Sequence, residues 1–223
     1  DSIDIAINQA AENYYQQAQK LSASRQQAAQ QLIKQVMSRL AELNLENAHF
    51  SIHLTQDNKP DQYGIDKVVF MFAPNPGMGE KPLHKIASGG ELSRISLAIQ
   101  VAGVRQKTEA TLIFDEVDSG VGGATAEVVG RLLKTLSQYN QVICVTHLAQ
   151  VAAFADNHIK ISKNVKHNET FTQFTTLTNT ARIDELARMS GGLQLDKKTR
   201  EHAQNMRQNA VQFTHTLTAG RTR

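Results

Sequence analysis

The chain begins with a helical pattern of apolar positions. The range 3–43 contains neither glycine nor proline and is rich in alanine and glutamine. Apolar side chains recur in it at helical spacings, at Tyr14, Ala18, Leu21, Ala28 and Leu32, with Arg25 in the remaining place. This period predicts one long helix with a heptad-like seam. Two interpretations stay open, a single surface helix and one strand of a coiled coil whose other strand lies elsewhere.

Two later parts of the chain show the alternation of strands instead. The ranges 49–55 and 66–72 alternate apolar and polar residues, and the turn-forming residues of 56–64 separate them. The ranges 158–165 and 170–178 alternate in the same way. They predict an edge hairpin.

Between these parts, short apolar runs alternate with helical patterns. The ranges 110–116 and 141–147 are apolar runs that end in polar residues, which is typical of buried parallel strands. The helical patterns cover the ranges 91–106, 124–138, 149–155 and 182–190, and a polar helix follows them. A strand, a helix and a second strand in this order predict a right-handed βαβ unit. The expected fold class is therefore α/β, with a mainly parallel sheet flanked by helices and preceded by the long helix.

Composition narrows the class of protein. Of the 223 residues 40% are hydrophobic, enough for a sizeable core, and the net charge of +3 gives no general argument for a polyanionic partner. Cys144 is the single cysteine, which excludes an internal disulfide and is typical of a reducing compartment. No apolar run approaches the roughly 20 residues that span a bilayer, and the first residues do not resemble a signal peptide. A cytoplasmic protein without a membrane partner is expected.

The helical range 91–106 is preceded by Ser88, Gly89 and Gly90. Glycine allows a ligand to approach the backbone closely, and the first turn of a helix presents free N–H groups and a partial positive charge. Such a start therefore suits an anion. Serine and glycine are also common N-cap residues of helices that bind nothing. This stretch alone is compatible with both interpretations.

Acidic residues end the first apolar run. Asp115 and Glu116 follow Phe114 at the carboxyl end of the expected strand, which is where open α/β sheets bind ligands. One carboxylate could hold Mg²⁺ through water while the other deprotonates an attacking water. The alternative is that both acids cap the next helix or are exposed turn charges.

A histidine ends the second apolar run. His147 is expected at the same sheet edge as Asp115, because the carboxyl ends of neighbouring parallel strands lie together. An imidazole there can hydrogen-bond a phosphate or position a water, although a histidine at a strand end is commonly structural. Ser88, Asp115, Glu116 and His147 occur in this order, each at the boundary of an element.

The order of these motifs resembles the C-terminal half of an ABC-type ATPase head, as found in SMC-like proteins. In that family SGGELSR (88–94) would be the signature motif, TLIFDE (111–116) the Walker B strand, VDSGVGG (117–123) the D-loop and VTHLAQVA (145–152) the His switch. The longer stretches LIFDEVDSGVGG and RIDELARMSGG resemble the bacterial double-strand-break repair members of this group. The resemblance covers most of the range 45–200.

The resemblance implies ATP and Mg²⁺ as cofactors and a role for each motif. Glu116 would be the general base, His147 would contact the γ-phosphate and the attacking water, and Asp115 would hold Mg²⁺ through water. The expected nucleotide contacts come from the signature motif and the D-loop and are Ser88, Gly89, Gly90, Glu91, Asp118, Ser119 and Gly120. The D-loop would cross the interface of a homodimer in which two heads enclose ATP.

A P-loop, the pattern Gly-x-x-x-x-Gly-Lys-Ser/Thr, does not occur in the sequence. The nearest stretch, PGMGEKP at 76–82, has Pro82 where the hydroxyl residue belongs. The expected explanation is that an N-terminal half of the same protein supplies the P-loop, so that this chain is inactive alone. Residues 1–43 would then be a returning coiled coil, and residues 44–223 the C-terminal half of the head.

The resemblance also implies DNA as a partner, a role in DNA repair and recombination, and a place at the nucleoid. Two alternatives stay open. An ABC-type ATPase subunit of another system, such as a transporter, shares the motifs, but the long helix before the head argues against it. A non-enzymatic binding fragment is favoured only by the missing P-loop.

Overall fold

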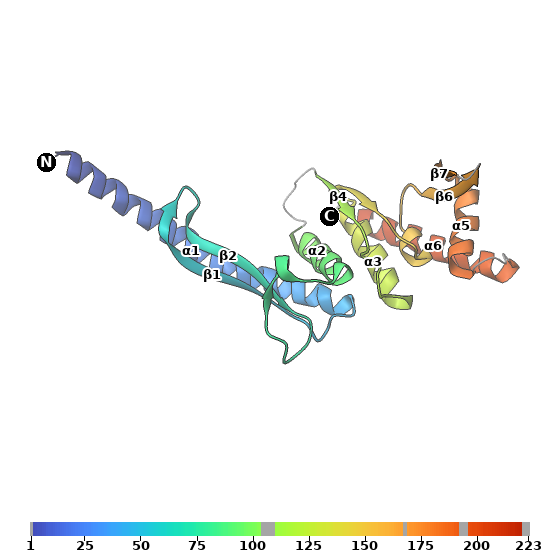
Figure 1. The fold of residues 1–223 in the computed structure, drawn as a ribbon, viewed down its shortest axis with the longest axis horizontal. Coiled ribbons are helices and arrows are strands. Elements are labelled where there is room, and N and C mark those ends of the chain that lie inside the picture. The colour runs from blue at the N-terminus through green and yellow to red at the C-terminus, as the bar shows by residue number, and fades with distance from the viewer. Residues whose placement is uncertain (1, 104–109, 167–168, 192–195, 220–223) are drawn as a thin grey trace. The chain divides into compact units, whose positions relative to one another are not determined.

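The computed structural model describes residues 2–103, 110–166, 169–191 and 196–219 (Figure 1). The chain divides into two compact units, Asp1–Ser88 and Gly89–Arg223. Its described strands form one three-stranded sheet and two two-stranded sheets. Among the described helices, none has the length and apolar character that a membrane span requires.

The first unit is built on a long helix. α1 spans Ser2–Glu42 and confirms the helix predicted for 3–43. Four of the six predicted seam positions are buried or half-buried, but Leu21 and Ala28 are exposed and the residues that follow them, Ser22 and Ala29, are buried instead. The side that is buried carries Ala18, Ser22, Ala29, Val36 and Leu40. The sheet of this unit packs on α1, and this cover decides which side of the helix is buried.

A β-hairpin lies along α1 (Figure 1). β1 spans His49–Asp61 and β2 spans Gly64–Ala73, and the two strands pair antiparallel. The turn predicted over 56–64 is therefore shorter, since the last pair of the ladder joins Asp61 and Gly64. Asp61 Oδ1 accepts a hydrogen bond from the Tyr63 N–H at 2.6 Å, which closes this turn. The short strand β3, Lys81–Pro82, and the 3₁₀ turn η1, Leu83–Lys85, follow.

Polar side chains fasten the hairpin to the helix. The Asp66 side chain of β2 is only 2% exposed and accepts hydrogen bonds from Ser22 Oγ at 2.7 Å and from Arg25 Nη1 at 3.0 Å. The bond from Ser22, opposed by burial and supported by Arg25, lowers the pKa of Asp66. The charged residue in the predicted seam, Arg25, is explained by this ion pair within the unit.

The second unit alternates helices and strands. In chain order its elements are α2 (Gly89–Gly103), β4 (Thr111–Phe114), α3 (Gly123–Leu136), β5 (Gln141–Cys144), α4 (Ala149–Ala152), β6 (Ile159–Lys166), β7 (Glu169–Thr176), α5 (Asn179–Gly191) and α6 (Lys197–Ala219). The helices and strands predicted here are present, with shifted ends. The last three residues predicted for the first of these helices, 104–106, lie outside the described residues.

β4, α3 and β5 form the predicted βαβ unit. β4 and β5 pair in parallel, with Ile113 opposite Ile143. Both strands end sooner than predicted, at Phe114 and Cys144, so the polar residues that follow them lie in loops. β6 and β7 form an antiparallel sheet of their own instead of an edge of the parallel pair.

The parallel pair is buried on one face only. Phe114 is 5% exposed, whereas Ile113 is 70%, Ile143 47% and Val145 53% exposed. Alternate residues of a strand point to opposite faces, so the paired residues Ile113 and Ile143 share a face with Val145. The apolar runs predicted strands that are buried on both faces. Within the described residues, the face with these three side chains stays open.

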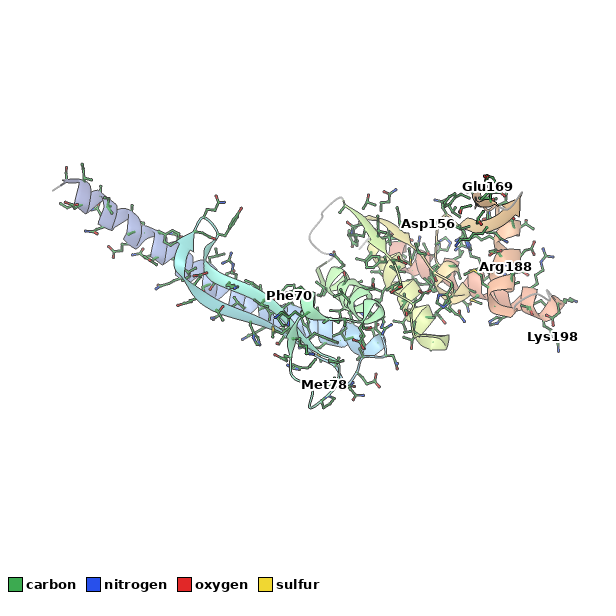
Figure 2. The ribbon with its side chains drawn as sticks, in the orientation of Figure 1. Phe70, Met78, Asp156, Glu169, Arg188 and Lys198 are labelled. Atoms are coloured by element: carbon green, nitrogen blue, oxygen red, sulfur yellow. The ribbon has the colours of Figure 1, made fainter. Side chains whose placement is uncertain are left out.

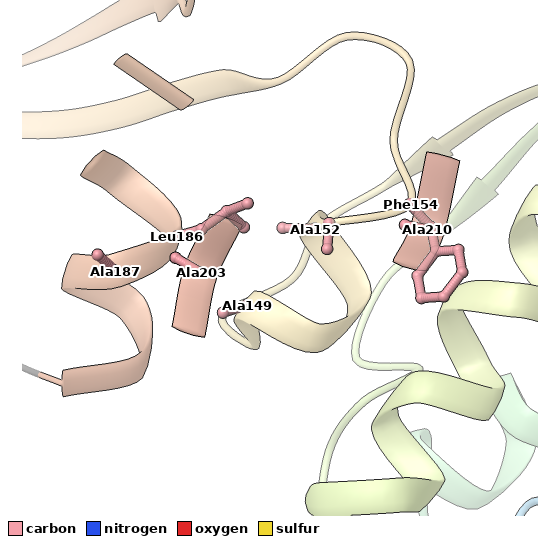
Figure 3. Close-up of a cluster of buried hydrophobic side chains, with 8 residues drawn as sticks. Ala149, Ala152, Phe154, Leu186, Ala187, Ala203 and Ala210 are labelled. Carbon is pink, nitrogen blue, oxygen red and sulfur yellow. The ribbon is translucent and has the colours of Figure 1, made fainter. Parts of the chain in front are cut away.

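Small residues allow the helices that follow β5 to pack closely (Figure 3). Buried side chains from α4, α5, α6 and the residues after α4 form one cluster of Ala149, Ala152, Ala153, Phe154, Leu186, Ala187, Ala203 and Ala210. Phe154 also lies against α3, because a Cβ atom added to Gly130 would come 2.4 Å from its Cδ2 atom. Only glycine at this helical position leaves room for the ring.

Cationic side chains hold the segment that follows α4. Arg207 Nη1 donates to the Ala153 carbonyl at 2.7 Å, and Arg182 Nη1 donates to the Asp156 carbonyl at 2.9 Å. The Asp156 carboxylate (Figure 2) pairs with Lys134 of α3. Burial, followed by the charge of Arg207, lowers the pKa of Arg182 to about 10. These contacts tie α3, α5 and α6 to the chain that leaves β5.

Candidate nucleotide-binding site

Loops at the carboxyl ends of β4 and β5 carry most of the predicted site residues. Asp115 and Glu116 directly follow β4, and His147 lies in the loop after β5. All three side chains are exposed. Gly89 begins α2 within the same compact unit, whereas Ser88 ends the other unit. The place of Ser88 beside the other residues therefore stays a prediction.

The start of α2 lies against the loop after β4. A Cβ atom added to Gly90 would come 3.0 Å from Ser119 Cβ and 3.2 Å from the Ser119 carbonyl oxygen. Ser93 Oγ donates to the Asp115 carbonyl at 2.8 Å, and Arg94 Nη1 donates to the Ser119 carbonyl at 2.5 Å. The signature-like stretch and the D-loop-like stretch are therefore joined within one chain.

Arg94, the last residue of the SGGELSR stretch, is a further functional candidate that was not among the predicted site residues. It is 8% exposed, and its Nε atom has no hydrogen-bond partner among the described residues. Burial lowers the pKa of Arg94, and the charge of Glu91 opposes this shift. A signal was present, because Arg94 lies among apolar positions of α2, where arginine is rarely found without a specific partner.

Glu116 combines an unusual backbone with a specific neighbour. Its φ is +57°, in the left-handed region that residues other than glycine rarely adopt. Its carboxylate lies beside the first residue of α2, since a Cβ atom added to Gly89 would come 2.6 Å from Oε2. A carboxylate at a helix N-terminus is stabilised by about 0.3–1 kcal/mol. The glycine start thus leaves room for an anion, and in this structure the nearby anion is Glu116.

The D-loop residues differ in exposure. Ser119 and Gly120 are exposed, whereas Asp118 is 2% exposed. Asp118 Oδ2 accepts hydrogen bonds from the Thr146 hydroxyl and, at 3.2 Å, from the His147 backbone N–H. The Asp118 side chain, expected from the resemblance at a nucleotide interface, is directed into its own unit. Asp118 and His147 are thereby brought together.

The negative charges near the strand ends also act on Cys144. Burial, followed by the charges of Asp118 and Asp115, raises the pKa of the Cys144 thiol to about 12. The thiol is therefore neutral at physiological pH. Cys144 is a packing residue of β5 and not a nucleophile.

The donor set at the β4 end fits Mg²⁺ only together with other ligands. Within the described ranges, no group of three or more His, Cys, Asp or Glu residues could hold a metal ion. The exposed Asp115 and Glu116 supply carboxylate oxygens, and Mg²⁺ is commonly bound by one or two carboxylates together with waters and phosphate oxygens. The residues fit a nucleotide-bound Mg²⁺ and not a metal held by the chain alone.

Comparison with solved structures gives the class of fold. The chain is similar to an Smc head domain with a coiled coil and joint from Pyrococcus yayanosii, with a TM-score of 0.55 and 23% identity over 85% of this chain and 33% of that one. The predicted fold class is confirmed: the chain has the α/β fold of an SMC-type ATPase head. No protein-family model matches the chain.

Comparison with curated proteins finds similarity to RecN proteins of several bacteria. The chain is 46% identical over 190 residues to DNA repair protein RecN of Haemophilus influenzae, 44% over 190 residues to that of Vibrio cholerae, and 42% over 198 residues to that of Xylella fastidiosa strain Temecula1. These matches cover 85–88% of this chain and 34–36% of the relatives. The predicted resemblance to the bacterial repair proteins is confirmed, and the chain spans about a third of their length.

Proposed function

We propose that the chain is the C-terminal part of the ATPase head of a RecN-like repair protein and that it takes part in ATP-driven head dimerisation and ATP hydrolysis. One observation carries the proposal. Glu116 and His147 lie in the loops at the carboxyl ends of the parallel strands β4 and β5, and the glycine start of α2 lies beside the Glu116 carboxylate. The similarity to RecN supports DNA double-strand-break repair and recombination as the process.

Each residue of the site has a proposed role. Glu116 is the general base that takes the proton of the attacking water, and His147 contacts that water or the γ-phosphate. Asp115 would hold Mg²⁺ through water, and the bound ion would supply positive charge to the transferred phosphate. The amides of Gly89 and Gly90 contact the γ-phosphate of the ATP that the opposite head of the dimer holds. The proposed flanking contacts are Ser88, Glu91, Ser119 and Gly120.

The open face of the parallel pair supports a second half of the head. Ile113, Ile143 and Val145 expose apolar surface of the kind that parallel sheets cover. On the β6-β7 sheet, Ile161 and its cross-strand partner Phe174 are 55% and 67% exposed. The chain spans about a third of the length of the RecN relatives, so the remaining part of such a protein could supply the segment that covers this face. We propose that an N-terminal half with the P-loop covers the parallel pair.

The free end of α1 supports the coiled-coil proposal. Ile3 and Ile7, which lie four residues apart on one face of the helix, are 71% and 59% exposed, and a partner helix would cover them. Residues 1–43 would be the returning coil and residues 44–223 the C-terminal half of the head. Two such heads would form a homodimer around ATP and act on DNA in the cytoplasm, at the nucleoid.

The test measures ATP hydrolysis by this chain, by a separately expressed N-terminal half with the P-loop, and by their mixture. We expect turnover only in the mixture. Glu116→Gln should lower kcat in the mixture by about 10²-fold or more, with ATP-dependent association retained, because it removes the base and keeps the shape.

The matched control is Glu127→Gln, which removes a surface carboxylate that pairs with Arg131 of the same helix. This variant should keep full turnover. Unchanged kcat in Glu116→Gln would exclude Glu116 as the base. Absence of turnover in every pairing, with association intact, would favour the non-enzymatic binding fragment.

A further inference from the structure

A buried carboxylate joins the two loops of the candidate site. Asp118, in the loop after β4, directs Oδ2 at the loop after β5, where it accepts hydrogen bonds from the Thr146 hydroxyl and the His147 N–H. Thr146 Oγ1 in turn accepts a hydrogen bond from the Leu148 N–H at 3.0 Å, directly before α4. Asp118 therefore fixes the backbone on both sides of His147.

The imidazole of His147 has a defined orientation toward this carboxylate. Its Nδ1 atom lies 3.4 Å from Asp118 Oδ2, while its side chain is 73% exposed. Nδ1 is thus the ring nitrogen next to the buried oxygen, and Nε2 is the one available to a ligand. A separation of 3.4 Å is long for a hydrogen bond, and contacts of this kind commonly tighten when substrate binds.

We propose that Asp118 is a positioning residue that selects the tautomer of His147. A neutral imidazole has one N–H donor and one acceptor nitrogen, and an ionised carboxylate only accepts. Nδ1 beside Asp118 Oδ2 therefore carries the proton, and Nε2 keeps its lone pair. In this form Nε2 can accept a hydrogen bond from the attacking water, which is one of the two contacts proposed above for His147. This meaning for hydrolysis rests on the proposed function, whereas the tautomer does not.

The burial of Asp118 argues for this role over a direct contact with nucleotide. Its side chain is 3% exposed, and the three polar atoms that Oδ2 approaches all belong to Thr146 and His147. A carboxylate that met a nucleotide on another subunit would have to leave these partners. The neighbouring Ser119 and Gly120 are exposed and can serve such an interface without this cost.

The tautomer is measured by NMR on the chain with ¹⁵N-labelled histidine, with the His147 signals assigned through a His147→Gln variant. We expect wild-type His147 to show a protonated Nδ1 and a lone-pair Nε2. Asp118→Leu should shift His147 toward the Nε2–H form that free imidazole favours. Thr146→Val is the matched control, because it breaks the same link between the loops but keeps the carboxylate, and it should leave the tautomer unchanged.

Three results would overturn the proposal. A wild-type His147 in the Nε2–H form excludes it without any variant, even if Asp118→Leu does not fold. An unchanged tautomer in a folded Asp118→Leu variant excludes it as well. An equal change in Thr146→Val and Asp118→Leu would assign the effect to the loop backbone instead of the carboxylate.

Hydrolysis is then measured in the mixture with the P-loop half. Asp118→Leu and His147→Ala should each lower kcat by about 10²-fold with little change in KM, and the double variant should lose no more than either one. A double variant that loses the product of both effects would show independent roles and contradict the proposal. If no mixture hydrolyses ATP, the proposed function fails, and the NMR result alone decides the role of Asp118.

Discussion

The left-handed backbone of Glu116 should make the Glu116→Gly and Glu116→Ala variants differ in stability. Its φ of +57° suits glycine and strains alanine. We expect Glu116→Gly to be more stable than Glu116→Ala by about 1 kcal/mol. The free energies of unfolding, measured in urea, give this difference directly.

The adjacent acid provides the control for this comparison. Among the described residues only Asn44 and Glu116 carry a side chain at positive φ, so Asp115 does not. At Asp115 the order should reverse, with Ala more stable than Gly, because glycine loses more backbone entropy. A Glu116→Gly variant less stable than Glu116→Ala would show that the backbone strain is absent in solution.

The loop positions of individual site residues could be predicted from the sequence, but their side-chain contacts could not. The loop positions of Asp115, Glu116 and His147 follow from where two apolar runs end. The burial of Asp118 depends on Thr146, a residue 28 positions away, and no local pattern contains that contact. Arg94 of α2 is similar, because its partner is the carbonyl of Ser119, which lies 25 positions away in the loop after β4.

Among the elements, α3 packs closely against the chain after α4 at Gly130, where the Phe154 ring lies on the helix. Gly130→Ala would place a methyl group 2.4 Å from Phe154 Cδ2, so the buried ring would have to move. We expect a loss of about 1–3 kcal/mol in the free energy of unfolding, although alanine is the better helix former. Thermal or urea unfolding of the chain measures it.

Gly103→Ala is the matched control at the end of α2. Apart from its chain neighbours and the backbone of α2, none of the described residues comes within 4 Å of a Cβ atom built at Gly103, so the same replacement should be neutral or slightly stabilising. Equal stability of the Gly130→Ala and Gly103→Ala variants would contradict the close packing of Phe154 against α3.

The elements themselves could be predicted from periodicity, because helices and strands impose their period on the sequence. The side of each element that another element covers could not be predicted in this way. The seam of α1 is displaced from Leu21 to Ser22 because the β1-β2 hairpin, and not a partner helix, packs on the central part of α1. The hairpin is longer than predicted because Asp61 closes a tight turn to Tyr63 within residues that resembled a loop.

For the whole molecule, the open face of the parallel pair predicts where the proposed P-loop half binds. Ile113 is 70% exposed, so Ile113→Lys should leave the unfolding of this chain unchanged. It should weaken association with the P-loop half at least tenfold, because an unpaired ammonium group would be buried at the contact. Isothermal titration calorimetry measures the Kd, and thermal unfolding checks the fold.

Ile3→Lys is the matched control, since Ile3 is 71% exposed on the free end of α1. Its effect should be confined to association that includes the partner strand of the coiled coil, and binding of a P-loop half without that strand should be unchanged. Unaltered binding of the Ile113→Lys variant would place the P-loop half elsewhere on the head.

The hydrogen bonds between α2 and the loop after β4 restrict these groups when the chain folds, so their conformational entropy is lost before a nucleotide binds. Ser93 and Arg94 hold that loop through the Asp115 and Ser119 carbonyls, and Asp118 holds His147. Groups that are fixed at folding need not be frozen again on binding, which spares about 0.5–1.5 kcal/mol for each side chain. A nucleotide would therefore meet α2, the loop after β4 and His147 already joined by these hydrogen bonds.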